Sequence, residues 1–487
     1  MGNAHEHDDI IFGTDGWRAV IADGFTFANV RRVAEAIGVA AQTMFAPPEI
    51  DRERLVVGYD RRFLSPDFAQ EVALVLSRAG FHVHLSDHPT PSQTISFAAA
   101  GRKILGGVVI TASHNPASYN GIKFKGWYGG SALPGMYAAI AENLGKRFER
   151  GGGSIVETDL LAEYVEALRA RVDVEMLRSA KLRILHDPIH GVAAGIPSRV
   201  LGLDEVESRL RSAGSSGMTH VTTIRGESNP SFGGVNPEPI PENLAASREA
   251  MRRGEFDLAI CNDGDADRLG ILDERGEFVS PHKILALLAL YLVRDRGESG
   301  EIVKTFSTGR LIERVASRLG VTCHETPVGF KHVADLMLSR PILIGGEESG
   351  GIGFGTFIPE RDGILSGLLV AEFVARSGRP LSKLVAEMER ELGSSAYDRR
   401  DLYRSRQACE RLVERARAGE LDSAFGLRLD QREDTDGVKL NFDDGSWILF
   451  RISGTEPLIR IYCESASEAR VESILETAVL ELDRVAS

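Results

Sequence analysis

Hydrophobic and polar positions follow two different periods along the first part of the chain. Between Asn29 and Met44 the apolar residues recur every three or four positions, which predicts an amphipathic helix. A second helix is expected from Ser65, which is followed by a first-turn proline, to Gly80. Three short continuous apolar runs predict buried strands, at 55–59, 81–85 and 107–110. This alternation predicts parallel strands joined by crossover helices.

The alternation resumes after a flexible, glycine-rich break at 151–154 and a bridging helix expected at 159–172. Further strands are predicted at 182–185, 258–261, 342–344, 447–450 and 458–462. The apolar run 284–293 predicts a core helix, because it is too short to span a bilayer. Three times an apolar strand is followed by a glycine-rich loop with acidic or hydroxyl residues and then by a helix; these loops begin near 111, 262 and 345. Ligands of open α/β sheets gather beyond the carboxyl ends of strands, so we expect the chemistry in these loops.

The length of 487 residues predicts about three domains, with four possible. Composition and pattern shift near residues 155, 277 and 385, which divides the chain into 1–155, 156–277, 278–385 and 386–487. Apolar residues make up 43% of the chain and charged residues 26%, which is typical of a soluble globular protein and excludes collagen-like, disordered and integral membrane proteins.

The charge balance narrows the class of partner. The chain has 57 Lys and Arg against 70 Asp and Glu, a net charge of −13, which argues against nucleic-acid binding. A small phosphorylated substrate remains compatible, because a few local cations reverse the field in one cleft. Four scattered cysteines without a CxxC pair and an N-terminus unlike a signal peptide predict a cytoplasmic protein with no membrane partner.

The segment DGDADR holds three carboxylates at alternate positions, Asp263, Asp265 and Asp267. Along an extended loop such side chains converge on one side, and three carboxylates suit Mg²⁺ or Ca²⁺. An EF-hand is disfavoured because its sixth position, which requires glycine, is Arg268. A solvated acidic turn is the other alternative, although a bound cation would relieve the mutual repulsion of the three carboxylates.

The segment TASHNP places Ser113 just beyond a predicted strand. It could be a helix N-cap, and without a GxSxG elbow it forms no serine triad with His114. A serine oxygen beside a helix N-terminus and a metal would serve as a phosphoryl carrier. Lys123 follows in NGIK and could supply a charge or relay a proton, although a lone lysine after a glycine turn is usually a surface residue.

Two further loops carry polar groups. GGEESGG offers carboxylates and a hydroxyl, which could grip sugar hydroxyls or form a charged surface turn. RISGTEP could wrap donors around a phosphate or form a basic hairpin; its candidate donors are Arg451, Ser453, the Gly454 backbone and Thr455, with Arg460 close enough in sequence to join them. No Walker A motif or convincing GxGxxG supports nucleotide binding.

Five segments taken together and in order resemble the α-D-phosphohexomutase family: FGTDGWR, TASHNP, DGDADR, GEESG and RISGTEP. That family includes phosphoglucomutases, phosphomannomutases and phosphoglucosamine mutases, and the resemblance covers essentially the whole chain. It implies an α/β molecule of four domains around a central cleft. Three of these are similar mixed α/β domains, and the fourth is a smaller C-terminal α+β domain.

The resemblance also implies site roles, residue by residue. Ser113 matches the phosphoserine, and the Mg²⁺ ligands are Ser113, Asp263, Asp265 and Asp267. The residues matched around the transferring phosphate are Arg18, His114, Lys123 and Arg268, with His114 and Lys123 as acid or base. The matched sugar contacts are Lys331, Glu347 and Ser349. The matched clamp on the other phosphate is Arg451, Ser453, Gly454 and Thr455.

Within the family the chain is most similar to the phosphoglucomutases. These interconvert glucose 1-phosphate and glucose 6-phosphate through a phosphoserine, with glucose 1,6-bisphosphate as intermediate and activator. The glucose enzymes resemble GEESG, the dual glucose/mannose enzymes GEMSG and the glucosamine enzymes GEQSG, so Glu348 favours glucose. His332 stands where an aromatic is common in glucose enzymes. The alternatives are a phosphomannomutase or dual-specificity mutase, a glucose-1,6-bisphosphate synthase, and a non-catalytic sugar-phosphate binding protein.

Overall fold

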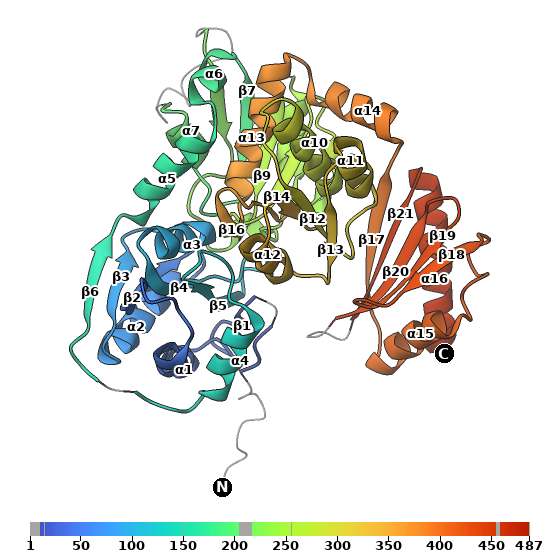
Figure 1. The fold of residues 1–487 in the computed structure, drawn as a ribbon. Helices are drawn as coiled ribbons and strands as arrows, with labels where there is room; N and C mark the ends of the chain where they lie inside the picture. Colours follow the sequence, from blue (N-terminus) through green and yellow to red (C-terminus); the bar gives the residue numbers. More distant parts are fainter. Residues whose placement is uncertain are drawn as a thin grey trace.

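Four β-sheets follow one another along the chain in a computed structural model that describes residues 10–13, 15–148, 150–203, 217–254, 256–453 and 458–486. Figure 1 shows them from the blue N-terminal domain, through two adjoining central domains, to the red C-terminal domain at the opposite end. We call these domains I (β1–β6), II (α5–β11), III (α10–α14) and IV (β17–α16). No helix in the described ranges is long and apolar enough to cross a membrane.

Domain I is a six-stranded mixed sheet with helices on both faces. Its strand order is β1-β5-β4-β2-β3-β6. All side chains of β4 are buried, because α1 and α2 cover one face of the sheet and α3 packs against the other. Its elements are β1 (Trp17–Val20), α1 (Phe27–Thr43), β2 (Asp51–Tyr59), α2 (Ser65–Arg78), β3 (His82–Ser86), α3 (Ser92–Gly101), β4 (Ile104–Ile110), β5 (Tyr119–Gly126), α4 (Pro134–Glu142) and β6 (Ser154–Thr158).

Domain II repeats this plan with five strands in the order β11-β10-β9-β7-β8. Asp159 caps the bridging helix α5 by accepting the Ala162 N–H. The elements are α5 (Leu160–Arg171), α6 (Val174–Ser179), β7 (Arg183–Asp187), α7 (Ile196–Val200), β8 (His220–Thr223), η1 (Phe232–Gly234), η2 (Pro241–Asn243), α9 (Ala245–Arg252), β9 (Leu258–Asn262), β10 (Leu269–Leu272) and β11 (Phe278–Val279).

Domain III has the strand order β13-β12-β14-β15-β16 and shares one hydrophobic core with domain II. The expected apolar core helix is α10, and Asp362 caps α13 by accepting the N–H groups of Ile364 and Leu365. The elements are α10 (Pro281–Arg294), β12 (Glu301–Thr305), α11 (Leu311–Leu319), β13 (Cys323–Thr326), α12 (Phe330–Ser339), β14 (Ile342–Gly346), β15 (Ile352–Phe354), β16 (Ile358–Arg361), α13 (Gly363–Ser377) and α14 (Leu381–Leu392).

Domain IV is built on a five-stranded antiparallel sheet in the order β17-β21-β20-β19-β18. Helices α15 and α16 pack on one face, and Trp447, Leu449 and Tyr462 on the other meet Phe306 of domain III. The elements are β17 (Ala396–Tyr403), α15 (Arg406–Ala418), β18 (Leu429–Glu433), β19 (Val438–Phe442), β20 (Trp447–Ile452), β21 (Leu458–Ser465) and α16 (Glu468–Ala486). The predicted fold class, three similar mixed α/β domains and a smaller α+β domain, is confirmed.

The structure differs from three details of the sequence-based prediction. The sheets are not wholly parallel, and the three glycine-rich loops lead into strands rather than helices. Strands β4, β9 and β14 are each followed by an antiparallel strand, β5, β10 and β15. The connecting loops are too short for a crossover helix, so the chain returns beside the strand it has just left. The expected break at 151–154 also ends in a strand, because Ser154 begins β6 beside β3.

Candidate active site

The DGDADR loop connects β9 to β10 at the carboxyl end of β9. Asp263, Asp265 and Asp267 are fully buried, and one ligand oxygen from each lies within 4.8 Å of the others. The Oδ1 atoms of Asp265 and Asp267 are buried without a hydrogen-bond partner. Burying acceptors in this way is costly unless a ligand satisfies them. The three carboxylates therefore fit a hard divalent cation such as Mg²⁺.

The surroundings of this loop exclude both an EF-hand and a solvated acidic turn. An EF-hand loop joins two helices, whereas this loop joins two strands. A solvated acidic turn would be exposed, whereas these carboxylates are buried.

Burial and repulsion by Asp267 and Asp265 raise the pKa of Asp263 well above its usual value. Burial also opposes ionisation of Asp265, but Lys123 and several hydrogen bonds lower its pKa below the usual value.

Ser113 lies against this cluster, on the loop that follows β4. Its Oγ donates a hydrogen bond to Asp263 Oδ2 at 2.8 Å, and the residue is 2% exposed. The loop runs through turns into β5 and begins no helix, so Ser113 is not an N-cap. Gly264 makes the approach possible, because a Cβ there would lie 2.6 Å from the Ser113 carbonyl oxygen. Tertiary structure thus joins the predicted serine loop of domain I to the predicted metal loop of domain II.

Lys123 on β5 is fully buried, so it is not the ordinary surface lysine that its sequence position suggests. Its Nζ lies 2.8 Å from Asp265, 3.1 Å from Asp267 and 3.0 Å from Asp15. Burial by itself would lower the pKa of Lys123, but the three carboxylates raise it far above its usual value. In this arrangement Lys123 keeps its proton and supplies a positive charge within the carboxylate cluster.

Asp15 and Arg361 complete this centre, and the sequence did not single out either as a site residue. Arg361 Nη2 lies 2.7 Å from Asp15 Oδ2 and 2.8 Å from Asp267 Oδ2. One guanidinium therefore ties domain I to the metal loop of domain II from the end of β16 in domain III. Asp15 lies within the quoted FGTDGWR segment, but Arg361 carries no local signal, since its partner Asp15 is 346 positions away.

The remaining residues predicted around the transferring phosphate gather beside Ser113. Arg18 Nη1 donates to Asn115 Oδ1 at 2.6 Å in the serine loop. Arg268 donates its N–H to Asp263 at 3.0 Å and its guanidinium to Glu238, another unpredicted residue, at 2.6 Å. His114 Nδ1 lies 3.4 Å from Ser113 Oγ. Burial, then Arg268 and Arg18, lower the pKa of His114 well below its usual value, so the imidazole is held in its neutral form.

The sugar-loop candidates follow β14. Glu347 is 6% exposed and lies 3.5 Å from Arg361 Nη1, so this segment is not a charged surface turn and it adjoins the acidic centre. Glu348 accepts a hydrogen bond from Ser307 Oγ at 2.6 Å. Ser349 is half-buried on the same loop, and Lys331 is half-buried in the first turn of α12. Of these side chains, Glu347 is linked to the metal loop by Arg361, which pairs with both Glu347 and Asp267.

The phosphate-clamp candidates lie in domain IV. Arg451 on β20 stands directly opposite Arg460 on β21. Like charges in such a pair repel, which favours an anion between or near them. Arg451 also pairs with Asp436 at 3.0 Å. The Ser453 N–H donates to the Leu458 carbonyl at 3.0 Å, whereas Gly454 and Thr455 lie outside the described residues.

Domain IV is held against domain III on the side of the sugar loop. The Arg310 N–H donates to Glu464 at 2.6 Å, and the Arg310 guanidinium reaches Asn441 at 2.9 Å. The Val328 N–H donates to Asp436 at 3.0 Å, and Asp436 in turn holds Arg451. The structure thereby links the predicted clamp to domain III, the domain that carries Glu347.

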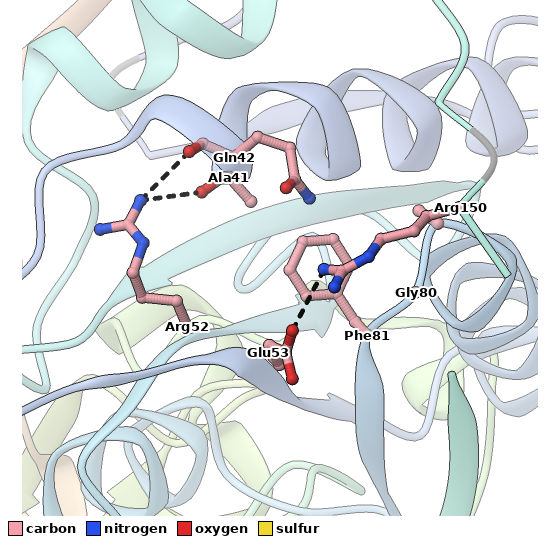
Figure 2. Close-up of a pocket in the computed structure, with 8 residues that line it drawn as sticks. Ala41, Gln42, Arg52, Glu53, Gly80, Phe81 and Arg150 are labelled. Atoms are coloured by element: carbon pink, nitrogen blue, oxygen red, sulfur yellow. Dashed lines mark hydrogen bonds and ion pairs between the residues drawn. The ribbon is translucent and has the colours of Figure 1, made fainter. Parts of the chain in front are cut away.

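A cavity elsewhere in domain I contains none of these residues. Figure 2 shows it near the end of α1, with Arg52 directed toward the carbonyls of Ala41 and Gln42 and Arg150 paired with Glu53. Arg52 also donates to the Met44 carbonyl at 2.7 Å. Because its arginines are already occupied by main-chain oxygens and a glutamate, we assign it no part in the chemistry.

The comparisons with known proteins cover nearly the whole chain. Models of the phosphoglucomutase/phosphomannomutase family match its α/β/α domain I at 9–150, domain II at 162–276, domain III at 280–391 and C-terminal domain at 407–480. A protein named phosphoglucomutase/phosphomannomutase from Thermococcus kodakarensis is 33% identical over 97% of this chain and 98% of its own. One named a probable phosphoglucosamine mutase from Methanothermobacter thermautotrophicus is also 33% identical, over 96% of each.

A solved structure is similar to this chain over nearly its whole length. A crystal structure titled as that of a "putative phosphomannomutase" from Thermus thermophilus is 36% identical, with a TM-score of 0.82 over 97% of this chain and 99% of that chain. The buried serine, the acidic cluster and the four-domain order therefore have a common explanation. The chain belongs to the phosphoglucomutase/phosphomannomutase family, whose members are phosphohexomutases, isomerases that transfer a phosphoryl group.

Proposed function

We propose that the chain is a Mg²⁺-dependent phosphoglucomutase that interconverts glucose 1-phosphate and glucose 6-phosphate. The observation that carries this proposal is the 2.8 Å hydrogen bond between Ser113 Oγ and Asp263 within a buried carboxylate cluster that has unpartnered oxygens. Asp263, Asp265 and Asp267 would hold the cation together with a phosphoserine oxygen. When bound, the cation would offset negative charge on the transferring phosphoryl group.

The residues around Ser113 suit phosphoryl transfer in both directions. The bond between phosphorus and Ser113 Oγ breaks while a sugar hydroxyl oxygen bonds to the same phosphorus, and the hydroxyl proton passes to a base such as His114. The product is glucose 1,6-bisphosphate. It reorients, and its other phosphoryl group returns to Ser113. Lys123, Arg18 and Arg268 stabilise the charge of the transferring group.

Domain IV would hold whichever phosphate is not being transferred. Arg451 and Arg460 provide two cations on neighbouring strands, and Ser453 lies at the start of the adjoining loop. Gly454 and Thr455 belong to the same proposed clamp. Because the two ends of the substrate exchange places, the clamp must recognise phosphate rather than one particular sugar position. Enclosing the substrate would also keep water from hydrolysing the phosphoserine.

Glucose preference is the part of the proposal that rests on the fewest residues. It depends on Glu348, whose carboxylate is held by Ser307 at 2.6 Å. The names of the relatives favour second candidates, because they include phosphomannomutase and phosphoglucosamine mutase. We therefore expect a panel of the 1-phosphates of glucose, mannose and glucosamine, assayed with Mg²⁺ and catalytic bisphosphate, to give the highest kcat/KM for glucose 1-phosphate.

Replacing Glu348 by methionine tests this preference. We expect the glucose-to-mannose ratio of kcat/KM to fall about tenfold, because the carboxylate held by Ser307 is lost. Glu387→Met in α14, where the Glu387 side chain is 41% exposed, is the matched control and should leave the ratio unchanged. A wild-type protein that turns over mannose or glucosamine phosphate better than glucose phosphate would transfer the proposal to that sugar.

The pH dependence of KM tests the role of Glu347. Burial raises the pKa of Glu347 to about 7, although Arg361 opposes the shift. Its carboxylate is therefore mostly protonated at pH 6 and mostly ionised at pH 8, where it accepts hydrogen bonds from sugar hydroxyls. We expect KM for glucose 1-phosphate to fall by up to about tenfold across these two pH units. Glu347→Gln should lose this component, whereas titration of the substrate phosphate affects both proteins; identical pH profiles would contradict the role.

A further inference from the structure

Arg62 is a fully buried arginine whose contacts converge on the serine loop. It is 1% exposed and follows β2. Its two terminal nitrogens donate to four main-chain carbonyls of that loop, those of Ser113 at 2.6 Å, Asn115 at 2.6 Å, Pro116 at 2.8 Å and Tyr119 at 3.0 Å. Four N–H groups thus meet four acceptors, which only the planar guanidinium fork can provide.

The other end of the Ser113 peptide is held through Asp60. Arg62 Nε lies 3.1 Å from Asp60 Oδ2, and this oxygen accepts a hydrogen bond from the Thr111 hydroxyl at 2.7 Å. Thr111 Oγ1 in turn accepts the Ser113 N–H at 2.9 Å. One buried ion pair therefore fixes both the N–H and the carbonyl group of Ser113.

The backbone of Ser113 needs such support. Its φ is +53°, in the left-handed region that L-residues other than glycine adopt rarely. A strained conformation of this kind persists only where the surroundings specify it strongly. Domain II also contacts Arg62, since the ring centroid of the buried Phe232 lies 4.9 Å from the Arg62 guanidinium carbon.

We propose that Arg62 is a positioning residue that holds Ser113 in its left-handed conformation, so that Oγ is aimed at the Asp263 carboxylate and the phosphoryl group is transferred along one direction. Arg62 touches neither substrate nor cation in this proposal, which rests on the proposed role of Ser113 as phosphoryl carrier. Its effect is therefore expected on the transfer step and not on sugar-phosphate binding.

Arg62→Lys tests the proposal, because lysine keeps the charge beside Asp60 but cannot reach four carbonyls. We expect kcat for glucose 1-phosphate to fall about 10- to 100-fold, since a small misplacement of a reacting atom costs this much. KM should stay within about twofold, because binding contacts are unchanged. The rate at which glucose 1,6-bisphosphate phosphorylates Ser113, measured by rapid quench and intact mass, should fall in parallel with kcat.

Arg52→Lys is the matched control. Arg52 also donates to main-chain carbonyls of domain I, those of Ala41, Gln42 and Met44, but it lines the separate cavity in Figure 2. It should lower thermal stability at most and leave kcat within about twofold. A folded Arg62→Lys protein with wild-type kcat and phosphorylation rate, or equal losses of kcat in both variants, would overturn the proposal.

Thr111→Val provides a second route if Arg62→Lys does not fold. It removes the hydroxyl that accepts the Ser113 N–H and nearly preserves side-chain shape. We expect a lower kcat with an unchanged KM, and an unchanged kcat in the folded variant would also refute the positioning role. A wild-type protein that never acquires phosphate on Ser113 would instead refute the proposed function, so the two failures are distinguishable.

Discussion

Replacing Ser113 by alanine should lower kcat for hexose phosphate isomerisation by at least about 10⁴-fold, because the variant has no oxygen to carry the phosphoryl group. The Asp263 carboxylate would also lose the donor that lies 2.8 Å from it. The measurement is a coupled assay with glucose 1-phosphate, together with intact mass of the protein after incubation with glucose 1,6-bisphosphate. Wild type should gain about 80 Da, one phosphoryl group, and the variant should gain nothing.

Ser86→Ala is the control for loss of a buried serine in the same domain. Its hydroxyl donates to the His88 carbonyl at 2.8 Å, at the end of β3. We expect this variant to retain kcat and the mass increase. Full mutase activity in Ser113→Ala, or an adduct mapped to another residue, would exclude the covalent mechanism through Ser113.

Asp265→Asn should have the second large effect, on both cation binding and activity. Asp265 has a buried, unpartnered Oδ1 that would bind the proposed cation, while its Oδ2 already accepts bonds from Ser92 and Lys123. An amide removes one negative charge from the cluster, so we expect Mg²⁺ affinity to fall about 100-fold and kcat/KM to fall at least as much. Titration calorimetry on the protein without substrate measures the affinity independently of activity.

Thermal unfolding provides a third readout for the same variant. A ligand that binds only the folded state at about 100 times its Kd stabilises that state by about 2.7 kcal/mol, so Mg²⁺ should raise the Tm of wild type but not of Asp265→Asn. Asp87→Asn is the control, because Asp87 belongs to a second group with His88 and Asp159 in which both carboxylates are exposed. Equal Mg²⁺ responses in wild type and Asp265→Asn would contradict the assignment of the cation site.

Much of the candidate site could be predicted from local sequence. The alternate spacing of Asp263, Asp265 and Asp267 predicts convergence within one loop, and the structure confirms their clustering. The apolar strand before each chemical loop was also predictable, since continuous burial leaves a continuous hydrophobic run. Strand direction was not, because the apolar run of β4 is the same whether the next strand returns beside it or after a crossover.

Other parts of the centre depend on residues that are distant in sequence. Asp15 and Arg361 are 346 positions apart, and each alone resembles an ordinary charged residue of a loop or strand end. Arg62 likewise stands in a segment, GYDRRF, that contains no recognised chemistry, and its role is visible only once the Ser113 carbonyl lies 2.6 Å away. Such residues are specified by the packing of domains against one another.

The sequence by itself determined the order of four units, the residue types in each loop and their resemblance to a phosphohexomutase, because motif chemistry and hydrophobic periodicity are local properties. Only the tertiary structure decided that Ser113 meets Asp263, that Lys123 is buried among three carboxylates and that one arginine joins three domains. These contacts follow from burial, since charges removed from water must find partners, and the partners come from whichever segments the fold brings near.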